Sequence, residues 1–155
     1  MKSDGILKPL AVVFLAAIAL YAVSYTAIEH RRTHKGPWQV QFTCGPSGAP
    51  TLVIDQPALA ITNVQITFTD ERCPADFTAV TIRFRDPQAV PWPVPFGQCL
   101  FMDTTFLPGT IVLSLFGHEI QFIPRVLTID RQEQPWTSHA VIPLTSTNLS
   151  SPNAL

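Results

Sequence analysis

The stretch YTAIEHRRTHKGPWQVQF, residues 25–42, changes its residue pattern twice. It ends a long apolar run, continues through the basic cluster HRRTHK, and then alternates apolar with polar residues. Gly36 and Pro37 are typical of a helix end, and the alternation over residues 38–43 predicts a half-buried strand. We therefore expect an apolar helix that leads, almost without a linker, into a β-domain.

The apolar run PLAVVFLAAIALYAVSYTAI, residues 9–28, has no ionisable side chain except two tyrosine phenols. As a helix it would be about 30 Å long, which matches the hydrocarbon core of a bilayer. We predict a transmembrane helix over 9–28, preceded by a short flank over 1–8. The alternative is a signal peptide cleaved after Ser24, but the length of the run favours a retained anchor.

The residues at the far end of this run are typical of a membrane interface. Tyr21 and Tyr25 lie one helical turn apart, where aromatic rings favour the headgroup level. Arg31, Arg32 and Lys35 follow in a basic juxtamembrane segment, residues 29–36, and could contact lipid phosphates. We predict these five residues as membrane-interface residues and membrane lipid as their partner.

The orientation of the helix cannot be read from charge, because basic residues flank it on both sides. A β-rich domain with little lysine behind a signal-like segment is typical of exported bacterial domains. We therefore expect a single-pass protein of the bacterial inner membrane, with its carboxyl-terminal domain in the periplasm.

The remaining chain carries strand signals and no sustained helical periodicity. Residues 64–68 and 80–85 alternate apolar with polar side chains, and short β-rich runs recur up to residue 144. We count about 8–9 short strands over 37–144, which predicts an all-β antiparallel sandwich or a small barrel. Residues 145–155 are polar and form a tail.

The clearest hairpin signal is TIVLSLFGHEIQFIP, residues 110–124. We expect its turn at Gly117 and His118, because a Gly-X pair suits a type II′ turn.

Charged residues make up 14% of the chain, against about 25% in average proteins. Either Thr, Gln, Asn and Ser supply the surface polarity, or partner proteins cover part of the surface. The net charge of −1 argues against nucleic acid as a partner.

The proline-rich segment RDPQAVPWPVPFGQC, residues 85–99, interrupts the strand pattern. A polyproline-like loop with an aromatic residue could dock onto another protein. The candidate partner-contact residues are Pro91, Trp92, Pro93 and Phe96. The alternative is a rigid connection that closes one end of the sandwich, with Trp92 over the core.

The three cysteines, Cys44, Cys73 and Cys99, do not have the spacing of a metal site. One pair could form a disulfide in an oxidising compartment. The simplest interpretation is three buried free thiols.

The sequence contains no recognisable catalytic motif. His118-Glu119 lacks the second histidine of a metalloprotease helix, and we interpret both as turn residues. Asp103 is best interpreted as a turn or capping residue. A hydrolase would need His118 or His139 beside an acid and a nucleophile in one cleft. We predict no catalytic residue, no metal, no cofactor and no small-molecule substrate.

These observations favour a non-catalytic accessory or structural subunit of a larger membrane complex, such as a respiratory or photosynthetic one. Its partners would be other integral-membrane subunits. The alternative is a membrane-tethered periplasmic module that binds a ligand or peptide in a concave pocket.

Overall fold

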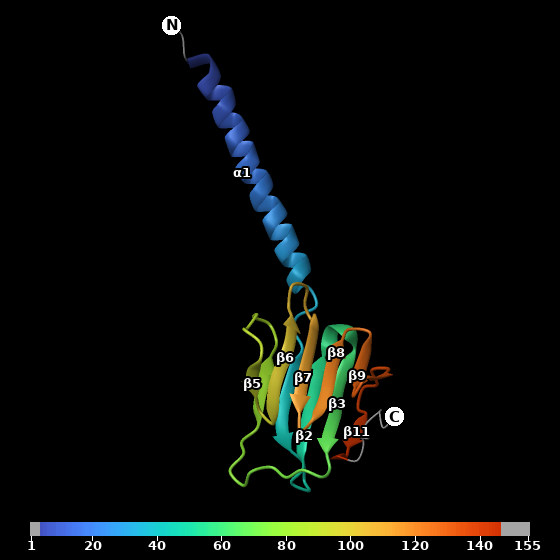
Figure 1. The fold of residues 1–155 in the computed structure, drawn as a ribbon. Helices are drawn as coiled ribbons and strands as arrows, with labels where there is room; N and C mark the ends of the chain where they lie inside the picture. The colour runs from blue at the N-terminus through green and yellow to red at the C-terminus, as the bar shows by residue number, and fades with distance from the viewer. Residues whose placement is uncertain (1–3, 147–155) are drawn as a thin grey trace, which may run out of the picture. The chain divides into compact units, whose positions relative to one another are not determined.

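The structure is a computed structural model that describes residues 4–146 (Figure 1). It contains two compact units, which meet in the sequence between His34 and Lys35. A single helix makes up the first unit, and the second unit contains all the described strands.

The first unit is helix α1 (Asp4–Thr33), which is long and apolar enough to cross a membrane. Its 30 residues span about 45 Å at about 1.5 Å per residue. Its large apolar side chains are 49–77% exposed. A helix that is apolar all round needs either a protein core or a lipid environment. Pro9 lies inside the helix and not in its first turn, because α1 begins at Asp4.

The second unit is a β-sandwich of two sheets. One sheet has the strand order β11-β3-β2-β1-β4 and the other β10-β9-β8-β7-β6-β5, so the sheets stay open and form no barrel. The strands are β1 (Gln39–Cys44), β2 (Pro50–Gln56), β3 (Ile61–Phe68), β4 (Val80–Arg83), β5 (Trp92–Val94), β6 (Gly97–Asp103), β7 (Thr110–Leu115), β8 (His118–Ile123), β9 (Val126–Ile129), β10 (Gln132–Gln134) and β11 (Val141–Leu144).

The prediction of a β-sandwich behind an apolar helix is confirmed, but the expected strand count was too low. Residues 4–146 contain 11 strands, and β5 and β10 have only three residues each. Three residues are too few to show an alternating pattern. Such strands form only because a neighbouring strand offers hydrogen-bonding partners.

The predicted antiparallel pairing holds for all but one of the described strand pairs. Among the described strands, β11 runs parallel to β3, with Val141 opposite Gln65 and Leu144 opposite Phe68. After β10 the chain leaves one sheet and joins the edge of the other. The direction of β11 therefore depends on this crossover and not on its own residues.

The core lies between the sheets, where alternate side chains of both layers meet. Trp38 packs against Phe122 of β8 and against Trp136, with ring centroids 5.7 and 5.0 Å apart. Both indoles also donate hydrogen bonds, Trp38 to the carbonyl of Gly109 and Trp136 to that of Ile123. The largest fully buried side chains are Trp38, Phe42, Phe68, Phe84 and Phe122.

The outward side chains of β1 and β3 are mostly Gln, Asn and Thr. Thr67 of β3 is partly exposed; it lies opposite Thr51 of β2, which is buried, and their hydroxyls are 3.3 Å apart. Gln39 and Gln41 occupy alternate positions of β1. On this face, uncharged polar side chains supply the surface polarity, in line with one of the two explanations for the low charge.

The turn of the β7–β8 hairpin lies one residue earlier than predicted. Phe116 and Gly117 have φ values of 50° and 82°, which is a type I′ turn, and Leu115 pairs with His118. A bulky residue rarely adopts a positive φ. The ring of Phe116 stacks on Phe96 and packs against Phe68, and these contacts offset the cost.

Candidate functional site

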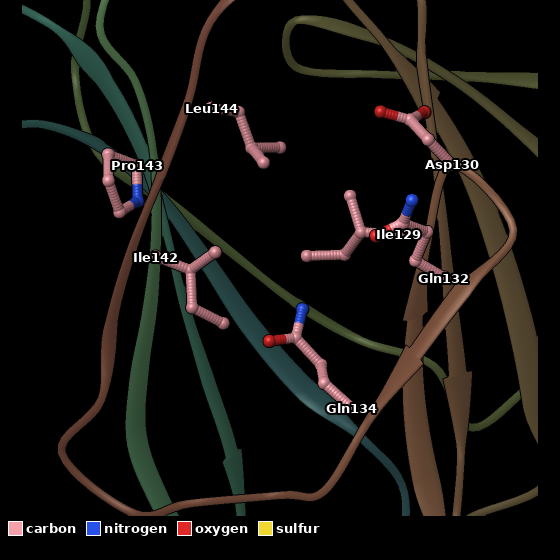
Figure 2. A pocket seen from close by; sticks show the side chains of 7 residues that line it. All are labelled: Ile129, Asp130, Gln132, Gln134, Ile142, Pro143 and Leu144. Carbon is pink, nitrogen blue, oxygen red and sulfur yellow. The ribbon is translucent and has the colours of Figure 1, made fainter. Parts of the chain in front are cut away.

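A cavity of about 390 Å³ lies at one lateral edge of the sandwich, between the last strands of the two sheets (Figure 2). Ligand pockets in proteins measure roughly 300–1,000 Å³, so this cavity is large enough for a small ligand or a few side chains. Figure 2 shows Ile142 and Leu144 pointing from β11 toward Ile129 and Gln134 on the opposite side. The lining residues are Ile129, Asp130, Gln132, Gln134, Ile142, Pro143 and Leu144.

The strand period explains how these side chains come together. Gln132 and Gln134 are two residues apart on β10, so both lie on the face that borders the cavity. Ile142 and Leu144 are spaced in the same way on β11. The result is an apolar wall opposite a pair of amides.

The amide groups of Gln132 and Gln134 form no hydrogen bond with any residue between 4 and 146. Each amide carries two donors and an acceptor oxygen. Both groups can therefore bind a molecule that enters the cavity.

The carboxylate of Asp130 borders the cavity, and Asp130 itself lies in the β9–β10 turn. Asp130 and Arg131 have φ values of 50° and 68°, which is again a type I′ turn. One carboxylate oxygen lies 2.6 Å from Nδ1 of His118, and the other accepts the backbone N–H of Glu119 at 2.9 Å. These bonds fix the carboxylate and join the turn to β8.

His118 is the first residue of β8 and is buried, which corrects its interpretation as a turn residue. It alternates with Ile120 and Phe122, which also point into the core. This alternation was visible in the sequence. It could have placed His118 inside, but it could not have identified Asp130 as its partner, because that contact depends on the β8–β9 pairing.

The structure does not assemble the hydrolase constellation from the described residues. His118 has an acid beside it, yet no described hydroxyl or thiol hydrogen-bonds to its ring. His139 is exposed, and its Nδ1 lies 3.4 Å from the amide nitrogen of Asn63. His139 is held near the start of β3 by a bond to Thr62, whereas His118 packs against Phe68 at its end.

The four candidate partner-contact residues divide into two pairs. Trp92 begins β5, and its half-buried ring packs 5.9 Å from that of Phe84. Phe96 lies in the β5–β6 turn within a cluster of phenylalanine rings. Pro91 and Pro93 remain exposed. The segment is thus partly a strand, and its aromatic side chains cover the core.

A different group of apolar side chains is exposed on β6 and the loop after it. Leu100, Phe101 and Phe106 are 38%, 50% and 62% exposed. The register of β6 against β7 shifts between Cys99 and Phe101, so two consecutive large residues there remain exposed. No pattern in the sequence singles out these residues, because a bulge is defined only by the partner strand.

The predicted membrane-interface residues lie in the last turns of α1 and just beyond it. The rings of Tyr21 and Tyr25 stack with centroids 6.3 Å apart. Arg32 forms an ion pair with Glu29 at 2.7 Å, so part of its charge is already compensated. Arg31 and Lys35 are exposed.

The interpretation of three free thiols was wrong, because Cys44 and Cys73 form a disulfide. The bond joins the end of β1 to the segment that leads into β4. Cys99 is free and buried, and burial raises the pKa of its thiol, partly offset by the Phe101 carbonyl and the Trp92 indole. The thiol of Cys99 is therefore protonated and poorly reactive.

Asp103 is the last residue of β6 and pairs with Thr110, so it is not itself in a turn, but its side chain caps the segment that follows. Its carboxylate accepts the backbone N–H of Thr105, and this hydrogen bond lowers the pKa of Asp103. Within residues 4–146 no group of three or more His, Cys, Asp or Glu could hold a metal ion.

Comparisons of the chain with protein-family models, with curated proteins and with solved structures find no match.

Proposed function

We propose that this chain is a non-catalytic accessory subunit of a larger membrane complex, anchored by α1. The observation that carries the proposal is that Leu100, Phe101 and Phe106, three of the six exposed large hydrophobic residues of the described β-domain, lie within seven residues of each other. Aromatic residues such as the two phenylalanines are enriched where proteins contact each other, and the buried centre of such a contact is more apolar than the rest of the surface. A partner protein that covers them would remove their apolar surface from water.

The disulfide supports an extracytoplasmic location for the β-domain. Disulfides persist in oxidising compartments, such as the bacterial periplasm, and are rare in the reducing cytosol. Cys44 and Cys73 therefore favour a single-pass protein of the inner membrane whose β-domain lies on the periplasmic side. The complex would include other integral-membrane subunits, as in respiratory or photosynthetic assemblies.

The test is extraction of native membranes in a mild detergent, followed by size separation and mass spectrometry. We expect the chain to co-migrate in constant ratio with other membrane proteins and to have the intact mass of 17.1 kDa. Migration as a single chain would overturn the proposal. A mass that corresponds to cleavage after Ser24 would overturn the anchor.

The surface itself is tested with the variant Leu100→Ser/Phe101→Ser/Phe106→Ser. We expect it to be lost from the complex while its β-domain keeps a normal unfolding transition. The matched control is Val141→Ser, because Val141 is also 62% exposed but lies on β11. If both variants are lost from the complex to the same degree, the partner does not bind specifically at Leu100, Phe101 and Phe106.

A second candidate function is a tethered module that binds a ligand or peptide. The cavity between β10 and β11 favours it, because it combines an apolar wall with unpaired amides and a carboxylate.

A further inference from the structure

We propose that the cavity between β10 and β11 binds an extended, positively charged peptide segment. In this proposal, Gln132 and Gln134 bond its backbone, and Asp130 attracts its charge. The inference rests on the second candidate function, the tethered binding module, and names its class of ligand.

The spacing of the two glutamines fits a peptide backbone. Gln132 and Gln134 are two residues apart on a strand, which is about 6.8 Å at about 3.4 Å per residue. An extended peptide points every second backbone amide in the same direction, with the same repeat. Each glutamine amide can donate to a backbone carbonyl and accept from a backbone N–H. The pair can therefore satisfy two successive peptide groups on one side of the ligand.

The wall formed by β11 fits the side chains of such a segment. Ile142 and Leu144 face the cavity with the same two-residue period, and Ile129 lies opposite them. Alternate apolar side chains of an extended ligand would meet this wall, while the side chains between them would face solvent.

The outer edge of β11 is poorly suited to pair with an added strand. This favours recognition of the peptide through the glutamines. The carbonyls of Ala140 and Leu144 accept hydrogen bonds from β3, so the backbone groups of Val141 and Pro143 point to the open edge. Pro143 has no N–H to offer there. An added strand would lack one of its donors, whereas the glutamine amides remain free.

The charge of the ligand follows from the acidic groups of this region. Asp130 is the one acidic residue among those that line the cavity, whereas Glu119 of β8 and Glu133 of β10 point to the outer face of their sheet. The basic groups are Arg131, exposed in the turn, and His118, which is already bonded to Asp130. A lysine or arginine of the ligand would therefore be attracted by the carboxylate of Asp130, whereas an acidic residue would be repelled.

The experiment uses the full-length chain in detergent micelles and an array of random decapeptides with blocked termini. We expect the bound peptides to be enriched in Lys, Arg and β-branched residues and depleted in Pro, which cannot provide every N–H. The strongest binder is then titrated against ¹⁵N-labelled protein. The side-chain amide signals of Gln132 and Gln134 should shift on binding.

The variant Gln132→Ala/Gln134→Ala should weaken this binder at least tenfold. The matched control is Gln39→Ala/Gln41→Ala, which makes the same change with the same spacing on β1, and it should leave binding within twofold. Equal binding by both variants would show that the peptide does not bind at Gln132 and Gln134, and it would not contradict the second candidate function, a binding module. If the array captures no peptide, the binding module fails as well.

Deletion of residues 147–155 tests whether the carboxyl terminus of the chain itself occupies the cavity. We expect the deletion to leave the affinity for the peptide unchanged. A gain of tenfold or more would assign the cavity to this terminus and overturn the proposal of a partner peptide.

Discussion

The two lateral edges of the sandwich use the same kind of outermost strand, yet one is closed and the other is open. Pro93 lies in the edge strand β5 and Pro143 in the edge strand β11, where a missing N–H discourages pairing with further strands. At the β4/β5 edge, the rings of Phe84 and Trp92 meet between the sheets. At the β10/β11 edge, a cavity of about 390 Å³ remains.

The difference shows that side-chain volume, and not strand pairing, closes an edge of this sandwich. Two aromatic rings fill the space between β4 and β5, whereas Gln134 and Ile142 leave the space between β10 and β11 unfilled. The prolines protect both edges from aggregation. At the open edge, a cavity and the unpaired amides of Gln132 and Gln134 occur together, which is why it is the candidate binding site.

The largest effect is expected from opening the closed edge with Phe84→Ala. Phe84 is fully buried, so the variant should lose about 4 kcal/mol of unfolding free energy. Urea denaturation of the full-length chain measures the loss. Phe106→Ala is the matched control: it removes an exposed ring and should change stability by less than about 0.5 kcal/mol. Equal losses in the two variants would contradict the role of Phe84 in closing this edge.

The closed edge also depends on the disulfide that holds the segment leading into β4. Cys44→Ser/Cys73→Ser releases a loop whose ends are 29 residues apart, which should cost about 3.5 kcal/mol. Urea denaturation under oxidising conditions measures this difference. In excess reductant the variant and the natural chain should be equally stable. A natural chain that is insensitive to reductant would refute the prediction.

At the open edge, Asp130→Ala should cost about 2.5 kcal/mol, because it leaves buried His118 and the N–H of Glu119 without their acceptor. Thermal unfolding measures the loss. Asp86→Ala is the control, since Asp86 is exposed and lies outside this network. If Asp130→Ala unfolds like the natural chain, the turn is held by its backbone alone.

Replacing a side chain with a larger one should affect stability differently at the two edges. Ile142→Phe adds volume where the cavity has space, so stability should stay within about 1 kcal/mol of the natural chain and peptide binding should weaken. Val94→Phe adds a ring at the packed edge and should cost about 2 kcal/mol. Urea denaturation of both variants gives the comparison, and the reverse order would show that the cavity is not available space.

The smallest expected effect is the response of the open edge to low pH. The hydroxyl and N–H of Ser146, just after β11, both bond to Asp70, and these bonds lower the pKa of Asp70. The bonds therefore stabilise the fold above the unfolded pKa of about 3.9 and are lost as pH falls through the lower folded value. The protection of the Ser146 amide, measured as its exchange rate relative to the intrinsic rate at each pH, should fall in that range. Asp70→Asn should show no such pH dependence.

The sequence predicted those features that depend on neighbours along the chain. The apolar run of α1 and the alternation over β1, β3 and β8 are visible in single segments, because helices and strands have their own periods. Of the four residues that the sequence indicated as partner contacts, Trp92 and Phe96 pack against the core. The sequence did not single out Gln132, Gln134 or Ile142.

The sequence by itself therefore determined an apolar helix followed by a β-domain with inward aromatic and outward Gln and Thr side chains. Only the tertiary structure decided which cysteines pair, that β11 runs parallel to β3, that Asp130 meets His118, and which edge stays open. Each of these features joins residues that are far apart in the chain or on different strands. Such contacts depend on which strands become neighbours, and local periodicity carries no information about that choice.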